Sequence, residues 1–77
     1  MTKRTLADLI EIATYGGGFE LSANDYSLDE LVKAADALYS GAWMRVLHTD
    51  ALTTKDLALI AQHGGPGGVQ FVFTAAI

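Results

Sequence analysis

Residues 63–73, with the sequence HGGPGGVQFVF, have the composition of a ligand-binding loop. Dense glycines can cradle a phosphate, because the backbone N–H groups then approach the anion closely. Nucleotide loops run from a strand through the glycines into a helix, whereas here the glycines follow a helical pattern and precede an alternating one. The carbonyl groups of a helix end repel phosphate, and no Gly-Lys-Ser/Thr motif follows. We therefore interpret these glycines as a helix stop and a turn, and we predict no nucleotide and no other cofactor.

The two histidines are the next candidates for chemistry. A triad can be drawn from Ser40, His48 and Asp50, but Ser40 lies in no strained nucleophile turn. A metal site would need at least a third ligand; none clusters near either histidine, and cysteine is absent. His63 falls in the last turn of a predicted helix, where an imidazolium interacts favourably with the helix dipole. We predict structural or surface roles for both histidines, no metal site and no enzymatic activity.

Three helix starts organise the chain. Each is a copy of Ser/Thr-x-x-Asp/Glu followed by leucine and an apolar helical pattern, and the copies are Thr5 to Asp8, Ser27 to Glu30 and Thr53 to Asp56. In this capping box the hydroxyl accepts a hydrogen bond from the backbone three residues on, and the acid accepts one from the cap residue. Glycine, which tolerates the left-handed backbone of a helix end, follows each block. The pattern predicts helices over residues 5–15, 27–39 and 53–63.

A short segment of period two follows each glycine stop, as in half-buried strands. These segments are residues 19–21, 44–46 and 69–73. The sequence therefore predicts one α/β domain over residues 1–77, in the order αβαβαβ, with a small parallel three-stranded sheet and all helices on one face. This arrangement resembles a very short leucine-rich-repeat-like solenoid, although the motif LxxLxLxxN is absent.

Alternation assigns each strand residue to a face of the predicted sheet. The residues expected to face the helices are Phe19, Leu21, Met44, Val46, Val69, Phe71 and Phe73. Those expected on the opposite, uncovered face are Glu20, Trp43, Arg45, Leu47, Gln70 and Val72. Trp and Arg are enriched at the energetic centres of protein interfaces, so this face is a candidate partner-binding surface. A different strand order would instead let a helix cover this face and make Trp43 part of the core; both interpretations stay open.

The charge balance narrows the class of partner. Nine acidic residues against five basic give a net charge of −4, which argues against direct nucleic-acid binding. Asp25, Asp29 and Asp50 fall near loops at one predicted rim, which could mimic phosphates toward a basic nucleic-acid-binding protein surface. The alternative is a solvated acidic face that keeps the protein soluble. No apolar window is long enough to span a membrane and acids interrupt the first apolar segment, so we expect a cytoplasmic protein without membrane contact.

In being short, acidic, cysteine-free and without a catalytic motif, the chain resembles the small proteins that phages and plasmids carry to block host defences, anti-CRISPR proteins among them. The resemblance implies binding to a host nuclease complex by masking or mimicking a DNA-contacting site, and it transfers no residue. The sequence favours a protein-interaction module that inhibits or regulates a larger complex. The alternative is a structural homodimer, formed through the uncovered face or through the open edge of the last strand.

Overall fold

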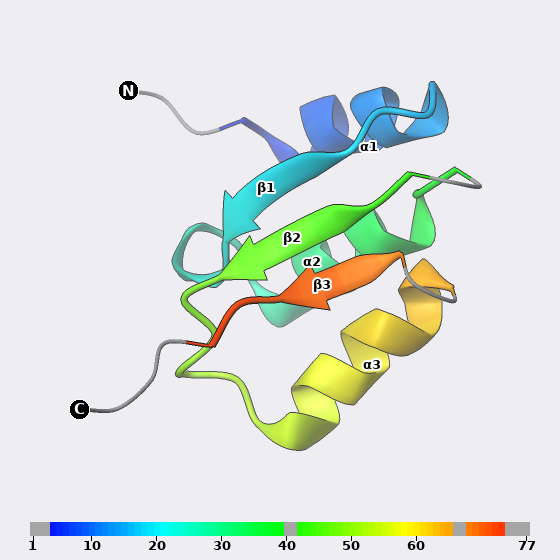
Figure 1. Ribbon diagram of the computed structural model, residues 1–77. Helices are drawn as coiled ribbons and strands as arrows, with labels where there is room; N and C mark the ends of the chain where they lie inside the picture. Colours follow the sequence, from blue (N-terminus) through cyan, green and yellow to red (C-terminus); the bar gives the residue numbers. More distant parts are fainter. Residues whose placement is uncertain (1–3, 40–41, 66–67, 74–77) are drawn as a thin grey trace.

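The computed structural model describes residues 4–39, 42–65 and 68–73 of the 77-residue chain. Three helices alternate with three strands (Figure 1). The elements are α1 (Leu6–Thr14), β1 (Phe19–Ser22), the 3-10 turn η1 (Ala23–Asp25), α2 (Leu28–Asp36), β2 (Met44–Leu47), α3 (Thr54–Gly64) and β3 (Val69–Phe71). None of the helices described is long and apolar enough to cross a membrane.

The three strands form one parallel sheet in the order β1-β2-β3, so each strand pairs with the next one along the chain. The register places Glu20 beside Arg45 and Arg45 beside Gln70. All three helices lie on the same side of the sheet, behind it in Figure 1. The predicted α/β class, with a parallel three-stranded sheet and helices on one face, is confirmed, and the structure decides the strand order that the sequence left open. The likeness to a leucine-rich-repeat solenoid stays a prediction.

Each helix begins at the predicted capping box. The hydroxyl oxygens of Thr5, Ser27 and Thr53 each accept a hydrogen bond of 3.2 Å from the backbone N–H three residues on. The acidic side chains in turn accept a hydrogen bond from the backbone N–H of the cap residue, at distances from 2.9 to 3.4 Å. Both bonds satisfy groups that the helix itself leaves without partners. The sequence pattern therefore fixed all three helix starts correctly.

The helix ends follow the prediction less closely. Glycines with positive φ follow α1 and α3 as expected, Gly16 at 89° and Gly65 at 74°. The ψ of 175° at Gly65 is that of an extended chain, so the end of α3 is not the left-handed cap that was expected. The second helix was expected to reach residue 39, but α2 ends at Asp36. Its last turn tightens there, with Leu38 N–H donating to the carbonyl of Ala35 at 3.2 Å. The glycine stop predicted at Gly41 lies outside the described residues.

The core lies between the sheet and the helices. Leu31 of α2, Met44 and Val46 of β2 and Ile60 of α3 are at most 1% exposed. Phe19, Leu21, Val69 and Phe71 join the same cluster from the outer strands, as their predicted direction requires. Burial of these side chains supplies most of the driving force that holds the helical layer to the sheet.

The prediction for Phe73 is wrong. It was expected in the last strand with its ring toward the helices, but β3 ends at Phe71 and Phe73 is 67% exposed. The last bond of the ladder runs from Val72 N–H to the carbonyl of Val46 at 3.0 Å. The neighbouring strand supplies no further partner, because His48 has a φ of 57° and turns the chain away from the sheet.

Candidate interaction surface

The face of the sheet that the helices leave open is the candidate surface. We call it the uncovered sheet face, and it consists of Glu20, Trp43, Arg45, Leu47, Gln70 and Val72. Trp43 is 41% exposed and Val72 is 40% exposed. The sequential strand order leaves no helix over this face among the described residues, so the alternative in which another order buries Trp43 in the core is not realised.

Trp43, Arg45 and Glu20 form the centre of this face. The guanidinium carbon of Arg45 lies 5.4 Å from the centroid of the Trp43 ring, within the range of a cation–π contact. Nη1 of Arg45 lies 4.0 Å from Oε2 of Glu20 on the neighbouring strand. Both contacts restrict the Arg45 side chain, which remains partly exposed. The centre therefore offers an aromatic ring and a charge pair in a fixed arrangement.

The backbone under Trp43 is held from the neighbouring segment. Phe19 N–H donates to the Trp43 carbonyl at 3.2 Å, which starts the β1–β2 ladder. At Gly18 any side chain would collide with that same carbonyl oxygen, so glycine is required there. The position of Trp43 thus depends on a close approach of two chain segments rather than on a flexible loop.

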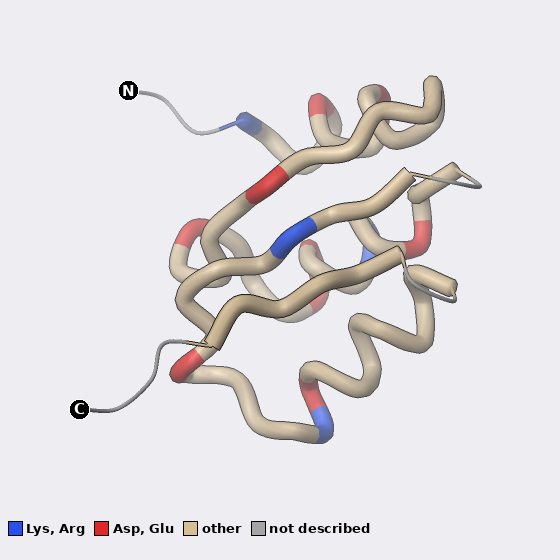
Figure 2. The backbone as a smooth tube through the Cα atoms, viewed as in Figure 1, with Lys and Arg blue, Asp and Glu red and all other residues tan. Residues whose placement is uncertain are grey.

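Charged groups are sparse on the sheet and widespread elsewhere. Of the residues in the three strands, one is acidic, in β1, and one is basic, in β2, and both positions are coloured in Figure 2. These are Glu20 and Arg45, which face one another in register. With one cation and one anion, the uncovered sheet face suits an uncharged or mixed protein surface better than a row of phosphates.

The three aspartates of the predicted acidic rim have different surroundings. Asp29 in the first turn of α2 pairs with Lys33, with Oδ2 and Nζ 3.1 Å apart. Asp25 ends η1 and lines a groove beside β1, whereas Asp50 lies exposed in the loop after β2. Figure 2 shows acidic positions on all three helices as well as in the segments that carry Asp25 and Asp50. Lys33 on the same helix compensates Asp29 in part, and the acidic rim stays a prediction.

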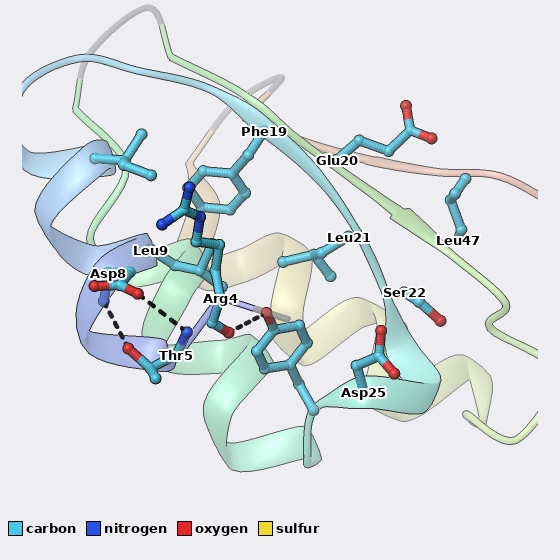
Figure 3. A pocket seen from close by; sticks show the side chains of 12 residues that line it. Arg4, Thr5, Asp8, Leu9, Phe19, Glu20, Leu21, Ser22, Asp25 and Leu47 are labelled. Atoms are coloured by element: carbon cyan, nitrogen blue, oxygen red, sulfur yellow. Dashed lines mark hydrogen bonds between the residues drawn. The ribbon is translucent and has the colours of Figure 1, made fainter. Parts of the chain in front are cut away.

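A groove of about 700 Å³ follows the outer side of β1 (Figure 3). Leu9 and Ile12 of α1 and Phe19 and Leu21 of β1 supply apolar lining. The charged groups that line it are Arg4, Asp8, Glu20 and Asp25. Sequence reasoning missed this groove, since it arises where α1, β1 and η1 meet in space.

Tyr26 closes one end of the groove. Its hydroxyl donates a hydrogen bond to the carbonyl of Arg4 at 2.5 Å, which ties the segment before α1 to the segment before α2. Burial raises the pKa of the Tyr26 phenol, and the negative charges of Asp25, Glu30 and Asp8 raise it further. This end of the groove is therefore an electronegative environment.

Ser22 and His48 meet at the carboxyl ends of β1 and β2, and their pairing was also missed. Ser22 Oγ lies 2.9 Å from His48 Nδ1 and accepts a hydrogen bond from Asn24 N–H at 3.1 Å. The only sequence signal for this contact would have been the strand register, which pairs Ser22 with Leu47. No carboxylate contacts the His48 ring within the described part of the chain, so the pair lacks the third group that activates a nucleophile.

The remaining candidates for chemistry have structural surroundings. His63 Nδ1 lies 3.4 Å from Oδ1 of Asp36, which links α3 to α2. Ser40, drawn earlier into a triad with His48 and Asp50, lies outside the described residues. Residues 4–39, 42–65 and 68–73 contain no group of three side chains that could hold a metal ion.

None of the family models, curated proteins or solved structures compared with the chain matches it.

Proposed function

We propose that the protein is a small interaction module that inhibits or regulates a larger protein complex, and that it docks through the uncovered sheet face. The observation that carries this proposal is the exposed Trp43 ring held against Arg45 at 5.4 Å. Tryptophan and arginine dominate the binding energy of many protein interfaces, and a ring fixed in advance loses little conformational entropy on binding. The charge pair beside it sets the orientation of the partner.

The size of the face indicates how the partner contacts it. Three strands about 4.8 Å apart, with four, four and three residues that each rise about 3.3 Å, present roughly 170 Å² in projection. A stable interface buries about 800 Å² on each side. The partner must therefore reach beyond the strands, onto the strand edges or the loops that carry Asp25 and Asp50.

A basic, nucleic-acid-binding complex is the partner that the charge of the chain favours. Nine acidic against five basic residues give the molecule a negative field, which speeds encounter with a basic surface. Acting in the cytoplasm, the protein would block such a site as anti-CRISPR proteins do. Binding of this kind weakens as salt rises from about 50 to about 200 mM, and unchanged affinity over that range would exclude the electrostatic version of the proposal.

The test compares two side chains of equal exposure. A partner captured from the native host is identified and purified, and its affinity is measured for the wild type, Trp43→Ala and Leu59→Ala. Trp43 and Leu59 are 41% and 40% exposed, but Leu59 lies on α3, behind the sheet. We expect Trp43→Ala to weaken binding by roughly 2 kcal/mol or more, with Leu59→Ala near wild type. Equal affinities for the two variants would contradict docking through this face.

Self-association is a second candidate, favoured by the edge of β3. Residues 64–77 contain no charged side chain, and natural edge strands usually carry charges that prevent pairing with another chain. Pairing of β3 with the same strand of a second copy would join two sheets into one. Light scattering on the purified protein decides between a monomer and a dimer.

A further inference from the structure

The outer edge of β1 presents backbone groups to the groove. Phe19 N–H bonds to β2, and alternate residues of a strand direct their N–H and C=O groups to opposite sides. The backbone N–H and C=O groups of Phe19 and Leu21 therefore bond to β2, whereas those of Glu20 and Ser22 point toward the open edge. The carbonyl of Ser22 already accepts the first hydrogen bond of η1, because Ser22 is the N-cap residue of that turn. Within residues 4–39, 42–65 and 68–73, the edge thus offers two donors, the N–H groups of Glu20 and Ser22, and one acceptor, the carbonyl of Glu20, to an incoming strand.

The groove runs along this edge and gives an incoming chain a place to lie. Its volume of about 700 Å³ falls within the range of binding sites for small ligands and short peptide segments. In Figure 3, α1 stands on one side of β1, and Phe19 and Leu21 extend from the strand toward that side. Ile12, which is 39% exposed, adds apolar surface to the same wall. Side chains of an added strand that pointed toward α1 would be buried against these groups.

The charges around the groove favour a cationic occupant. Among the residues that the structure describes, Asp8, Glu20 and Asp25 line the groove together with one cation, Arg4. Glu20 lies on the uncovered sheet face, with Arg45 as its neighbour on the β2 side. A lysine or arginine on an added strand would become its neighbour on the other side, so Glu20 would lie between two cations.

We propose that this groove binds an extended, basic segment of a partner protein, which adds to the sheet as a fourth strand alongside β1. The backbone of the segment pairs with Glu20 and Ser22. Its apolar side chains pack toward α1, and its cationic side chains, at alternating positions, face Glu20. This site shares Glu20 and Leu47 with the uncovered sheet face but does not include Trp43, and it goes beyond the function proposed above.

The first test uses a fluorescently labelled peptide of alternating lysine and valine, about seven residues long, which covers β1 with a margin at each end. Fluorescence anisotropy should show saturable binding to the wild-type protein. A peptide with the same residues in two blocks, and one alternating glutamate and valine, should each bind at least about tenfold more weakly, which corresponds to 1.4 kcal/mol. Equal affinity for the three peptides would overturn the proposal.

N-methylation of the peptide tests strand addition without altering the protein. In antiparallel addition, lysines opposite Glu20 and Ser22 direct their N–H groups to β1; in parallel addition, the valine N–H groups do so. We therefore compare a peptide methylated at all lysine amides with one methylated at all valine amides, and we expect only one of them to lose binding. Loss of binding by the lysine-methylated peptide indicates antiparallel addition, and loss by the valine-methylated peptide indicates parallel addition. Equal effects in the two peptides would rule out pairing with the edge.

Two protein variants locate the bound peptide. Ile12→Ala removes exposed apolar surface from the groove wall, and Leu59→Ala removes a side chain of nearly equal exposure outside the groove. We expect Ile12→Ala to lower the affinity about fivefold, from about 1 kcal/mol of lost apolar contact, and Leu59→Ala to leave it unchanged. Equal peptide affinities for these two variants would contradict the site. Trp43→Ala should bind the peptide as the wild type does. The peptide site and docking through Trp43 can therefore be disproved independently of each other.

Discussion

The two faces of the sheet belong to the same three strands and differ in what covers them. On the helix side of β2, Met44 and Val46 have no exposed surface, whereas the Arg45 side chain between them is 42% exposed on the other side. A shift of one residue along the strand thus separates a core position from a surface position. The packing that stabilises the fold therefore lies on one face of the sheet, and the residues of the other face are free for recognition.

The largest difference in stability should lie between a substitution on the covered face and one on the uncovered face. Met44→Ala opens a cavity in a closed core and should lower the free energy of unfolding by about 2 to 5 kcal/mol. Arg45→Ala removes an exposed side chain with a long ion pair and should cost about 0.5 kcal/mol or less. Urea unfolding followed by circular dichroism measures both. Similar losses for the two variants would mean that the faces are not distinct in energy.

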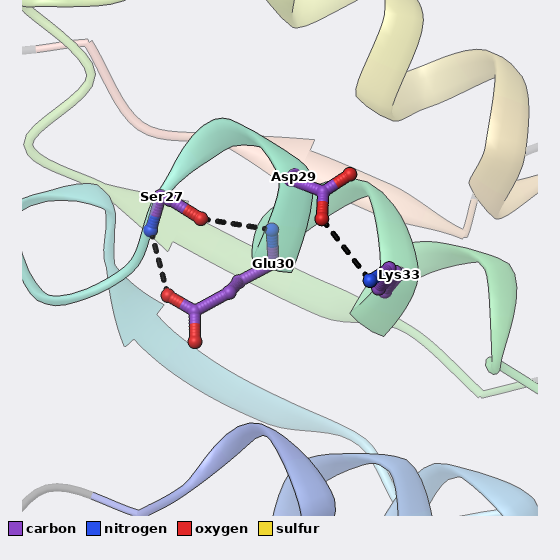
Figure 4. A network of polar contacts seen from close by, with 4 residues as sticks. All are labelled: Ser27, Asp29, Glu30 and Lys33. Carbon is purple, nitrogen blue, oxygen red and sulfur yellow. Dashed lines mark hydrogen bonds and ion pairs between the residues drawn. The ribbon is translucent and has the colours of Figure 1, made fainter.

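A smaller loss of stability should follow from substitutions in α2, one of the helices that cover one face of the sheet. Figure 4 shows two kinds of polar contact in α2, the capping box of Ser27 and Glu30 and the ion pair of Asp29 and Lys33. Ser27→Ala leaves backbone groups of the first turn without partners and should cost about 1 kcal/mol. Lys33→Ala breaks only an exposed pair and should cost about 0.3 kcal/mol. If thermal unfolding gave the two the reverse order, the capping box would not be what fixes this helix start.

The smallest effect concerns Tyr26, at the boundary between the covered side and the groove. Its pKa is raised by burial and by neighbouring acids, so the folded state holds the phenol proton more tightly than the unfolded chain. The resulting stabilisation is fully present below about pH 10, the pKa of an unperturbed tyrosine, and is lost as the pH rises through the folded-state pKa.

Urea unfolding between about pH 9 and pH 11 should therefore show a steeper loss of stability for the wild type than for Tyr26→Phe. The phenylalanine variant also lacks the bond to Arg4, so the slopes are compared and not the absolute values. Parallel slopes would show that Tyr26 does not titrate differently on unfolding.

The sequence predicted the helix starts and the direction of the strand side chains because these depend on local signals, whereas it left the strand order open. A hydroxyl and an acid three residues apart determine a capping box without help from the rest of the fold. Alternation likewise placed Met44 and Arg45 on opposite faces, since the period of a strand is fixed by its backbone. The prediction for Phe73 was wrong because the end of β3 depends on where its neighbour ends, and His48 ends that neighbour.

The groove and the Ser22 to His48 contact could not be predicted in the same way. Arg4 and Tyr26 meet across 22 positions of sequence, and Ser22 and His48 meet across 26. Contacts at such separations depend on the packing of whole elements, for which a short pattern in one segment carries no signal. The partner-binding residues of the uncovered sheet face were predicted from alternation, and their role stays a proposal.

The sequential strand order has a consequence for how the protein can fold during its synthesis. Each strand after the first pairs with the strand that precedes it in the chain, so no pairing depends on a segment that is synthesised later. Between the end of β2 at Leu47 and the end of β3 at Phe71, a ribosome needs roughly 1 to 5 s at about 5 to 20 residues per second. Because β2 also leaves the ribosome before β3, β1 and β2 can pair first, with Met44 and Val46 partly sheltered by α1 and α2. The order of assembly can thus match the order of translation.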